Sequence, residues 1–252
     1  MAWVLDLDGV VWRGDQALAG AADAVARLRA AGERVLFVTN NSYAAAATTE
    51  AKLARMGIPA AGDVVTSAMA GAALVEPGER VLVCGGPGIA EAVTGRGAEP
   101  VLNRGTDDGV GEVDVVMVGY HRDFDYERLR VATFALQRGA RLVATNDDAT
   151  YPTDEGILPG GGSLVAAVAY ASGKAPEVAG KPHEPMAALV RAMVGADGTV
   201  VGDRPDTDGR FAVTLGYRWA LVLSGVTTEA DLPVEPPPDV VAPDLASLVP
   251  PA

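Results

Sequence analysis

Two aspartates interrupt an apolar run near the start of the chain. In the stretch WVLDLDGVVW, residues 3–12, Asp6 and Asp8 stand two positions apart among Val, Leu and Trp. On an extended strand, residues two apart project from the same face. Unit charges about 4 Å apart repel by on the order of 4 kcal/mol at an effective dielectric constant near 20. Two acids placed in this way need compensation, so the stretch alone indicates either a solvated strand end or turn, or a functional site.

Three further polar stretches follow apolar runs that we predict to be strands. They are VTNNS at residues 38–42, AGKP at residues 179–182 and VGDRPDTD at residues 201–208. The carboxyl ends of the strands of a parallel sheet form its ligand crevice, so these stretches are predicted to meet Asp6 and Asp8 there. The TNN sequence offers a hydroxyl, two amides and backbone NH groups, which suit phosphate oxygens, although the same sequence also fits a loop or a helix cap.

The acids at these strand ends favour a metal site made of oxygen ligands. Asp203 ends a predicted strand, and Asp206 and Asp208 follow it. Several carboxylates without Cys and with few His suit a hard cation, of which Mg²⁺ is the prime candidate. We interpret Asp203 as a metal ligand and Asp206 as the N-cap of the next helix. Lys181, one of three lysines in the chain, offers a compact ammonium for both a carboxylate and a phosphoryl oxygen.

Short apolar runs alternate with Ala-rich amphipathic segments, as in α/β proteins with parallel sheets. Strands are predicted at residues 3–8, 63–67, 80–86, 113–120, 140–146, 177–182, 198–204 and 218–224, and a further strand over residues 34–42 is predicted to run into a polar loop. Helices are predicted over residues 20–31, up to 56, 67–74, from 87, 125–137, 163–172, 184–194 and 206–216. The polar stretches named above therefore lie at strand ends.

The break EPGE at residues 76–79 separates two series of strands and helices. We therefore expect one domain made of residues 1–76 and 177–252, and a second domain, residues 77–176, inserted into it. Residues 150–162, TYPTDEGILPGGG, are interpreted as a loop, and the proline-rich tail from residue 233 as extended chain along the surface.

Composition excludes several classes of protein. The chain has 252 residues, 49% hydrophobic residues and a net charge of -13, and its basic residues form no run of the kind that binds nucleic acid. No apolar stretch approaches the roughly 20 residues of a membrane span. Cys84 is the single cysteine, and the first strand starts without a secretory signal, so we expect a cytoplasmic protein.

With DLDGVVW, VTNNS, GKP and GDRPDTD in this order, the chain resembles a phosphatase of the haloacid dehalogenase superfamily. Within the superfamily it is most similar to the para-nitrophenyl phosphatase-like branch, which includes phosphoglycolate, glycerol-3-phosphate and pyridoxal-phosphate phosphatases. The match covers nearly the whole chain except the proline-rich tail. It implies a Rossmann-like parallel-sheet core and an inserted α/β cap, which is the domain of residues 77–176.

The resemblance also implies a mechanism for small phosphate monoesters. Asp6 is then the nucleophile that forms an aspartyl-phosphate, and Asp8 is the general acid and base. Lys181 steadies Asp6 and the transferring group. The phosphoryl oxygens are held by Thr39 and the amides of Asn40 and Asn41. Mg²⁺ is bound by Asp6, Asp203 and the backbone carbonyl of Asp8, with Asp208 close behind.

The organic part of the substrate is expected to meet the cap. The candidates for this contact are Asn146, Asp147 and Tyr151, which follow the strand at residues 140–146. Pyridoxal-phosphate phosphatases have His where Tyr151 stands, so the resemblance counts against pyridoxal phosphate as the substrate. His183 fits the start of a helix better than a ligand contact. Pairing of two chains through the cap is a further expectation.

Two other functions fit parts of the pattern. A receiver domain also holds an aspartyl-phosphate with acids, a hydroxyl and a Lys, but it is about half as long and its phosphate-accepting Asp lies on a middle strand. A non-catalytic phosphate-binding protein is the other alternative. Such a protein would not need Asp8, so the pair of acids argues for phosphate chemistry.

Overall fold

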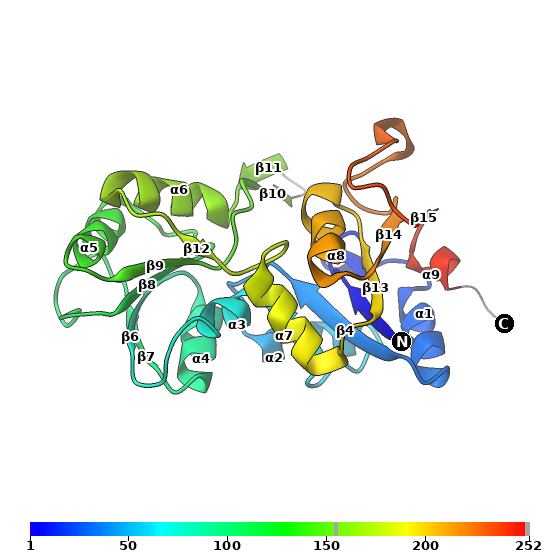
Figure 1. Ribbon diagram of the computed structural model, residues 1–252, viewed down its shortest axis with the longest axis horizontal. Helices are drawn as coiled ribbons and strands as arrows, with labels where there is room; N and C mark the ends of the chain where they lie inside the picture. Colours follow the sequence, from blue (N-terminus) through cyan, green and yellow to red (C-terminus); the bar gives the residue numbers. More distant parts are fainter. Residues whose placement is uncertain (154–155, 250–252) are drawn as a thin grey trace. The chain divides into compact units, whose positions relative to one another are not determined.

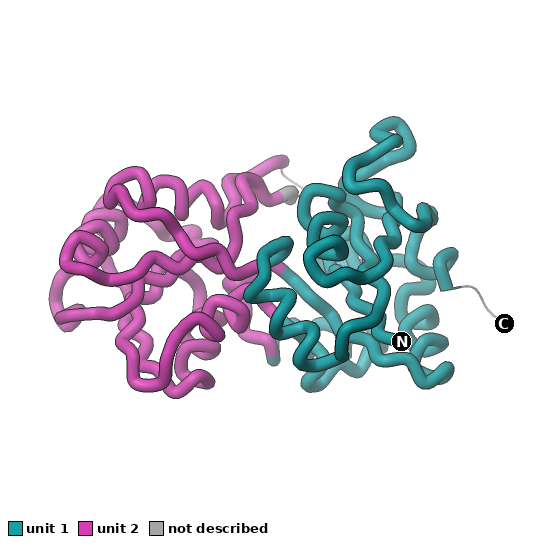
Figure 2. Tube along the Cα trace, viewed as in Figure 1, with its two compact units in different colours: residues 1–39, 47–65, 181–252 teal, residues 40–46, 66–180 magenta. Residues whose placement is uncertain are grey.

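The computed structural model describes residues 1–153 and 156–249. The chain forms two compact units, shown in different colours in Figure 2. Unit 1 contains residues 1–39, 47–65 and 181–252, and unit 2 contains residues 40–46 and 66–180. Unit 2 thus extends beyond the predicted insertion at both ends and takes in the loop that follows residue 39. The assignment of residues 77–176 to an inserted functional domain stays a prediction.

Unit 1 is built on a six-stranded sheet with strand order β15-β14-β13-β1-β4-β5 (Figure 1). β1 is parallel to β4 and β13, and β14 is parallel to β13 and β15. This arrangement confirms the predicted α/β class with a parallel sheet. The strands are β1 (Ala2–Leu5), β4 (Arg34–Thr39), β5 (Val64–Thr66), β13 (Gly198–Gly202), β14 (Arg218–Val222) and β15 (Val240–Ala242).

The helices of unit 1 connect these strands. Both α1 and α7 have amphipathic sequences, and their apolar positions are buried, as in crossover helices of parallel sheets. They are α1 (Ala21–Ala30), α2 (Ala46–Arg55), α7 (Glu184–Val194), α8 (Arg210–Leu215) and α9 (Leu245–Leu248), with a π-helix over Pro205–Gly209 and a 3-10 helix over Glu229–Asp231. A short antiparallel pair, β2 (Trp12–Arg13) and β3 (Gln16–Ala17), follows β1.

The tail beyond residue 233 is not simply extended chain, as the sequence had suggested. Val240–Ala242 form the edge strand β15, and Leu245–Leu248 form α9. The side chain of Asp239 accepts a hydrogen bond from the amide of Trp219 at 2.7 Å, and Arg27 Nε donates to the carbonyl of Val249 at 2.8 Å. Residues 236–238 are prolines that precede β15 and Pro243 follows it, so no proline lies within the strand to block its pairing with β14.

Unit 2 has a five-stranded sheet in which every neighbouring pair is parallel, with strand order β12-β9-β8-β6-β7. Its strands are β6 (Arg80–Cys84), β7 (Glu99–Leu102), β8 (Val115–Val118), β9 (Arg141–Ala144) and β12 (Glu177–Val178). Its helices are α3 (Ser67–Ala72), α4 (Pro87–Gly95), α5 (Tyr126–Gln137) and α6 (Gly161–Ser172). β7, with a proline at its second position, was not predicted.

Each face of this sheet carries a separate core, because successive strand residues point to opposite sides. On β8, Val116 and Val118 join a core with α5 and α6, whereas Val115 and Met117 join a core with α3 and α4. Strands buried on both faces read as continuous apolar runs, which is why VVMV gave a clear signal in the sequence.

The segment interpreted as a loop, residues 150–162, contains an antiparallel strand pair. β10 (Thr150–Thr153) pairs with β11 (Gly156–Pro159), and Tyr151 lies opposite Leu158. The prolines and glycines of this segment conceal the pairing at the level of sequence. α6 then begins at Gly161, two residues earlier than predicted.

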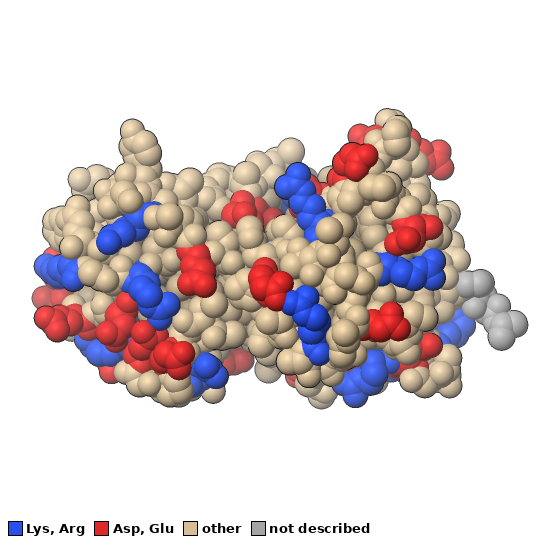
Figure 3. Space-filling model, in the orientation of Figure 1, with Lys and Arg blue, Asp and Glu red and all other residues tan. Residues whose placement is uncertain are grey.

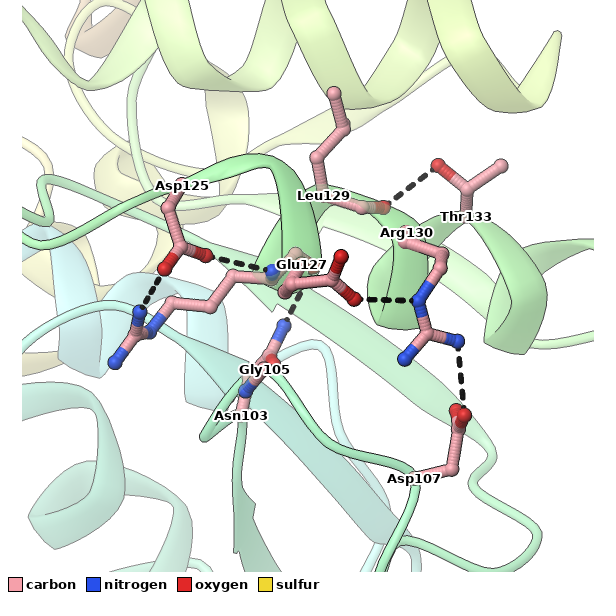
Figure 4. Close-up of polar contacts among 9 residues, drawn as sticks. Asn103, Gly105, Asp107, Asp125, Glu127, Leu129, Arg130 and Thr133 are labelled. Atoms are coloured by element: carbon pink, nitrogen blue, oxygen red, sulfur yellow. Dashed lines mark hydrogen bonds and ion pairs between the residues drawn. The ribbon is translucent and has the colours of Figure 1, made fainter.

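The N-terminus of α5 is tied to the loop that follows β7 (Figure 4). The Asp125 carboxylate accepts a hydrogen bond from the amide of Arg128 at 2.9 Å, which caps the helix. Arg130 bridges Glu127 and Asp107, each at 2.8 Å. Asn103 Nδ2 donates to the carbonyl of Arg128 at 2.9 Å. These contacts fix the loop against the helix within unit 2.

Basic and acidic side chains are interspersed on the face of the molecule in Figure 3. The formal net charge of the whole chain is -13, but this face presents side chains of both signs. Among the described residues, no helix has the length and apolar character that crossing a membrane would require.

The two cores of unit 2 predict a contrast between two leucines of neighbouring strands. Leu82 on β6 is fully buried, whereas Leu102 on β7 is 48% exposed. We expect Leu82→Ala to lower the free energy of unfolding by about 2–5 kcal/mol, because it leaves a cavity. Leu102→Ala is the control and changes it by roughly 0.5 kcal/mol or less. Urea unfolding followed by circular dichroism measures both, and equal losses would contradict the assigned core.

Candidate active site

Three aspartates converge at the carboxyl ends of the two central strands of unit 1. Asp6 follows β1, Asp203 follows β13, and Asp208 lies in the π-helix after β13. Pairing of Leu5 with Val201 places the ends of β1 and β13 side by side. One carboxylate oxygen from each aspartate lies within 4.8 Å of the other two. The parallel register of two strands therefore brings together residues about 200 positions apart in the chain.

Lys181 binds two of these acids. Its Nζ lies 2.5 Å from Asp6 Oδ1 and 2.7 Å from Asp208 Oδ1. The Lys181 side chain is 4% exposed, compared with 13% for Asp6 and 2% for Asp208. A buried ammonium is tolerated because two carboxylates accept hydrogen bonds from it and balance its charge. The backbone amide of Arg204 donates to Asp208 Oδ2 at 3.2 Å and fixes the far side of that carboxylate.

Asp203 is held by the loop after β14. The amide of Val226 donates to Asp203 Oδ2 at 2.6 Å, and the Thr227 hydroxyl donates to the Asp203 carbonyl at 2.6 Å. Gly9 and Gly225 pack directly against the Asp203 carboxylate, and a methyl group at either position would overlap it. Gly9 has φ +80°, a left-handed conformation that favours glycine.

The crowding of acids raises two pKa values. Burial raises the pKa of Asp6 well above its usual range, Lys181 opposes this, and Asp208 and Asp203 add to it. Burial and the neighbouring Asp208 raise the pKa of Asp203 to about 7. Burial lowers the pKa of Lys181, but the carboxylates of Asp208 and Asp6 outweigh it and raise that pKa overall. The ammonium thus stays charged, whereas the acids repel one another.

This donor set fits a divalent metal ion. Three carboxylates against one ammonium leave two negative charges at the sheet edge, which a divalent cation would balance. All the candidate ligand atoms in the cluster are oxygens, the type that Mg²⁺ and Ca²⁺ prefer. Asp6 and Asp203 have raised pKa values in the protein alone, which is the electrostatic sign of a cluster that a cation would relieve.

Asp8 lies apart from the buried cluster, where the chain leaves the sheet. It is exposed, and its Oδ1 accepts a hydrogen bond from the indole Nε1 of Trp12 at 2.9 Å. Partial desolvation raises the pKa of the Asp8 carboxyl, and the Trp12 hydrogen bond opposes this shift. The predicted contact of a metal with the Asp8 carbonyl stays a prediction. The carboxyl itself is available to exchange a proton with a bound molecule.

Of the predicted phosphate-binding residues, Thr39 belongs to unit 1 and the other two to unit 2. Thr39 ends β4, the strand beside β1, and is 5% exposed. Asn40 Nδ2 donates to Asp148 Oδ2 at 3.0 Å, and the Asn40 carbonyl accepts from Ser67 Oγ at 2.7 Å. Asn41 Oδ1 accepts from the amide of Tyr43 at 2.9 Å. Their predicted role in binding phosphate stays a prediction.

The predicted substrate residues of the cap all lie in unit 2. Asn146 is 3% exposed, its Nδ2 donates to the Asn40 carbonyl at 2.9 Å and its Oδ1 accepts from the amide of Asp148 at 3.2 Å. The Asn146 amide therefore holds its own loop together. Asp147 is exposed, and Tyr151 on β10 is 43% exposed. The Tyr151 ring lies 5.8 Å from the ring of Tyr120.

Near the cluster, one prediction is wrong, one agrees with the structure, and one loop was not predicted. Asp206 does not cap a helix: it pairs with Arg204 at 3.2 Å, because a π-helix occupies Pro205–Gly209 and α8 begins only at Arg210. His183 is the N-cap residue of α7, in agreement with the helix-start interpretation. The loop of residues 224–227, which carries the Asp203 contacts, was missed because it contains no acid.

Family models match two stretches of the chain, of which the first covers the start of unit 1 and continues into unit 2. Residues 3–99 match the model described as haloacid dehalogenase-like hydrolase, and residues 178–248 match the one described as HAD-hydrolase-like. Asp6, Asp8 and Thr39 fall in the first match, and Lys181, Asp203 and Asp208 in the second.

One curated relative and two solved structures are similar to nearly all of the chain. D-glycerol 3-phosphate phosphatase of Mycobacterium tuberculosis is 39% identical over 97% of this chain and 70% of its own length. The magnesium complex of glycerol phosphate phosphatase from the same species superposes with a TM-score of 0.87 at 38% identity, covering 98% of this chain and 76% of that one. For 4-nitrophenylphosphatase of Thermotoga maritima the TM-score is 0.88 at 31% identity, covering 98% and 95%.

The packing of Gly225 against Asp203 predicts a steric effect on metal binding. Gly225→Ala places a methyl group on the Asp203 carboxylate, so we expect the affinity for Mg²⁺ to fall at least about tenfold. Gly95→Ala is the matched control, because nothing lies within 4 Å of the added methyl group. Isothermal titration calorimetry with Mg²⁺ measures both variants. Unchanged binding by Gly225→Ala would contradict the role of Asp203 as a ligand.

The raised pKa of Asp203 predicts how stability changes with pH. The folded protein holds the Asp203 proton with a pKa of about 7, more tightly than the unfolded chain with its pKa of about 3.9. The free energy of unfolding of the metal-free protein therefore falls as pH rises from about 4 to 7, by about 2–4 kcal/mol.

The variant Asp203→Asn lacks this titration and is expected to show a correspondingly smaller fall over the same interval. Urea unfolding in the presence of a chelator, repeated across this pH range, makes the comparison. A fall of the same size in both proteins would show that other groups cause it.

Proposed function

Because this chain belongs to the family of haloacid dehalogenase-like hydrolases, we propose that it is a Mg²⁺-dependent phosphatase of small phosphate monoesters. This proposal applies the resemblance inferred from the four motifs, which the family matches confirm. The observation that supports the proposed mechanism is that buried Lys181 contacts both Asp6 and Asp208, and that Asp203 lies beside them. That group provides a nucleophile and positive charge at one end of a parallel sheet.

In the first step, an Asp6 carboxylate oxygen attacks phosphorus, and the bond from phosphorus to the ester oxygen breaks. Asp8 gives its proton to the departing oxygen, so the organic product leaves as a neutral alcohol. The product on the protein is an aspartyl-phosphate at Asp6. Lys181, 2.5 Å from Asp6 Oδ1, orients the nucleophile and offsets the negative charge that gathers there.

In the second step, water gives a proton to Asp8 and its oxygen attacks phosphorus, so the bond from phosphorus to Asp6 breaks. Inorganic phosphate leaves, and Asp8 is again protonated for the next cycle. Asp6, Asp203 and the Asp8 carbonyl would hold Mg²⁺, with Asp208 close by. When bound, Mg²⁺ neutralises charge on the phosphoryl oxygens. Thr39 and the amides of Asn40 and Asn41 bind those oxygens.

Glycerol 3-phosphate is the preferred candidate substrate, because a relative that is 39% identical is named for that activity. Phosphoglycolate and para-nitrophenyl phosphate are the next candidates. Asn146, Asp147 and Tyr151 stay the predicted contacts for the organic group. The cytoplasmic location and the homodimer formed through the cap also stay predictions.

Phosphate release from a panel of esters tests the proposal. The panel contains glycerol 3-phosphate, phosphoglycolate, para-nitrophenyl phosphate, pyridoxal phosphate and nucleoside monophosphates, each with Mg²⁺ and with a chelator. We expect release only with Mg²⁺, and a loss of at least about a thousandfold in Asp6→Asn, which lacks the nucleophile. Lys174→Met, at an exposed lysine, is the control for Lys181→Met, which is expected to lose activity.

The same experiment separates the alternatives. Full activity in the chelator would refute the metal site, and an active Asp6→Asn would refute the nucleophile. Binding of phosphate esters without release, unaffected by Asp8→Asn, would identify a non-catalytic phosphate-binding protein. Acid quenching of the enzyme with a labelled ester tests the aspartyl-phosphate, which is expected to retain label on wild-type protein and not on Asp6→Asn.

A further inference from the structure

The turn after β1 brings Trp12 against the carboxyl group of Asp8. The Leu7 carbonyl accepts hydrogen bonds from the amides of Val11 and Trp12 at 2.9 and 3.1 Å. The amide of Gly9 donates to the Trp12 carbonyl at 2.8 Å, which closes the turn. Trp12 then pairs with Ala17 in the β2–β3 hairpin. The turn and the hairpin thereby fix Trp12 relative to Asp8, and Ser224 Oγ from the loop after β14 donates to the Gly9 carbonyl of the turn at 2.6 Å.

The indole of Trp12 engages one particular oxygen of Asp8. Its Nε1 lies 2.9 Å from Asp8 Oδ1. An indole NH can only donate, so Oδ1 must act as the acceptor in this contact. In a protonated carboxyl the unprotonated oxygen is the stronger acceptor, so this contact favours the acid proton on Oδ2 when Asp8 is protonated. Trp12 is 5% exposed and Asp8 is exposed, so the buried ring anchors a carboxyl group that faces outward.

Lys52 of α2 lies over the ring of Trp12. Its Nζ lies 4.3 Å from the centroid of the Trp12 ring, a cation–π contact. The same Nζ donates to the Gly14 carbonyl at 2.7 Å and pairs with Asp15 at 3.2 Å. Asp15 is fully exposed, so that ion pair contributes little. The contacts with the ring and the carbonyl join α2 to the hairpin that carries Trp12.

We propose that Trp12, braced by Lys52, is a positioning residue that directs the acid proton of Asp8 to Oδ2 and holds that oxygen toward the leaving group. The inference rests on the proposed function, in which Asp8 protonates the ester oxygen as its bond to phosphorus breaks. Without the indole NH, the exposed carboxyl rotates and its proton is shared between both oxygens. Neither Trp12 nor Lys52 touches the reacting atoms in this role.

This role has a signature that depends on the leaving group. An alcohol such as glycerol leaves poorly as an alkoxide and needs the proton from Asp8. A dinitrophenolate is a stable anion and leaves without protonation. The kcat/KM for each ester reports the steps up to formation of the aspartyl-phosphate, so it isolates the proton transfer to the leaving oxygen.

The test compares Trp12→Phe with wild type on glycerol 3-phosphate and 2,4-dinitrophenyl phosphate. Phe keeps an aromatic ring and removes the NH. We expect kcat/KM for glycerol 3-phosphate to fall about ten- to a hundredfold, part of the general-acid contribution, and that for the dinitrophenyl ester to change less than about threefold. Equal losses on both esters, or no loss on either, would overturn the positioning role.

Lys52 provides a second test that leaves Trp12 in place. Lys52→Met removes the cation from the ring, and we expect a selective loss of about three- to tenfold on glycerol 3-phosphate. Lys52→Arg restores a cation and is expected to recover most of that loss. Arg55→Met, which removes a cation from the same helix without a contact to Trp12, is the control and leaves both esters unchanged.

These outcomes are separable from a failure of the proposed function. If wild-type protein with Mg²⁺ hydrolysed neither ester, the phosphatase assignment itself would fail. If wild type hydrolysed both and Lys52→Met lost activity equally on both, only the positioning role would fail. Circular dichroism and thermal unfolding of each variant verify the fold, and the Lys52 series decides the question if Trp12→Phe does not fold.

Discussion

The carboxylates of Asp6, Asp203 and Asp208 repel one another, and the residues at the end of the unit 1 sheet must offset this repulsion. Lys181 neutralises part of it from a buried position, with contacts of 2.5 and 2.7 Å to two of the acids. The backbone amide of Val226 fixes the carboxylate of Asp203, and that of Arg204 holds the far oxygen of Asp208. Residues without side chains, Gly9 and Gly225, let the chain pass close to Asp203. The residues around the three aspartates are therefore explained by electrostatics rather than by hydrophobic packing.

The contrast between Asp6 and Asp8 shows how two identical side chains acquire different chemistry. Asp6 lies beside a buried ammonium, which favours the carboxylate form and orients it. Asp8, two residues later, lies at an exposed turn beside an indole NH. A carboxylate fixed by a cation suits nucleophilic attack, and an exposed carboxyl that accepts a hydrogen bond from a neutral donor suits proton exchange. The end of β1 separates these environments over a single turn of chain.

Much of the cluster could be predicted from the sequence, because parallel strands bring their carboxyl ends to one edge and Asp6, Lys181 and Asp203 each follow an apolar run. The surroundings of Asp8, which involve Trp12 and Lys52, could not be predicted from the sequence. Trp12 has the pattern of a core residue, and Lys52 that of the solvated face of α2. Their contact requires the turn at residues 7–12, which no periodicity describes. β15 was missed because prolines precede a strand of only three residues.

The order of the chain has a consequence for biosynthesis. β1 lies between β4 and β13, and Asp6 gains its partners only from residues 181–208. A nascent polypeptide emerging from the ribosome therefore carries its first acid through synthesis of all of unit 2 before β13, the second neighbour of β1, exists. Unit 2 has its own sheet and two cores and is complete earlier, whereas unit 1 closes by contacts of long sequence separation, which form slowly. The acidic cluster is assembled last, so an unfinished chain carries no complete centre.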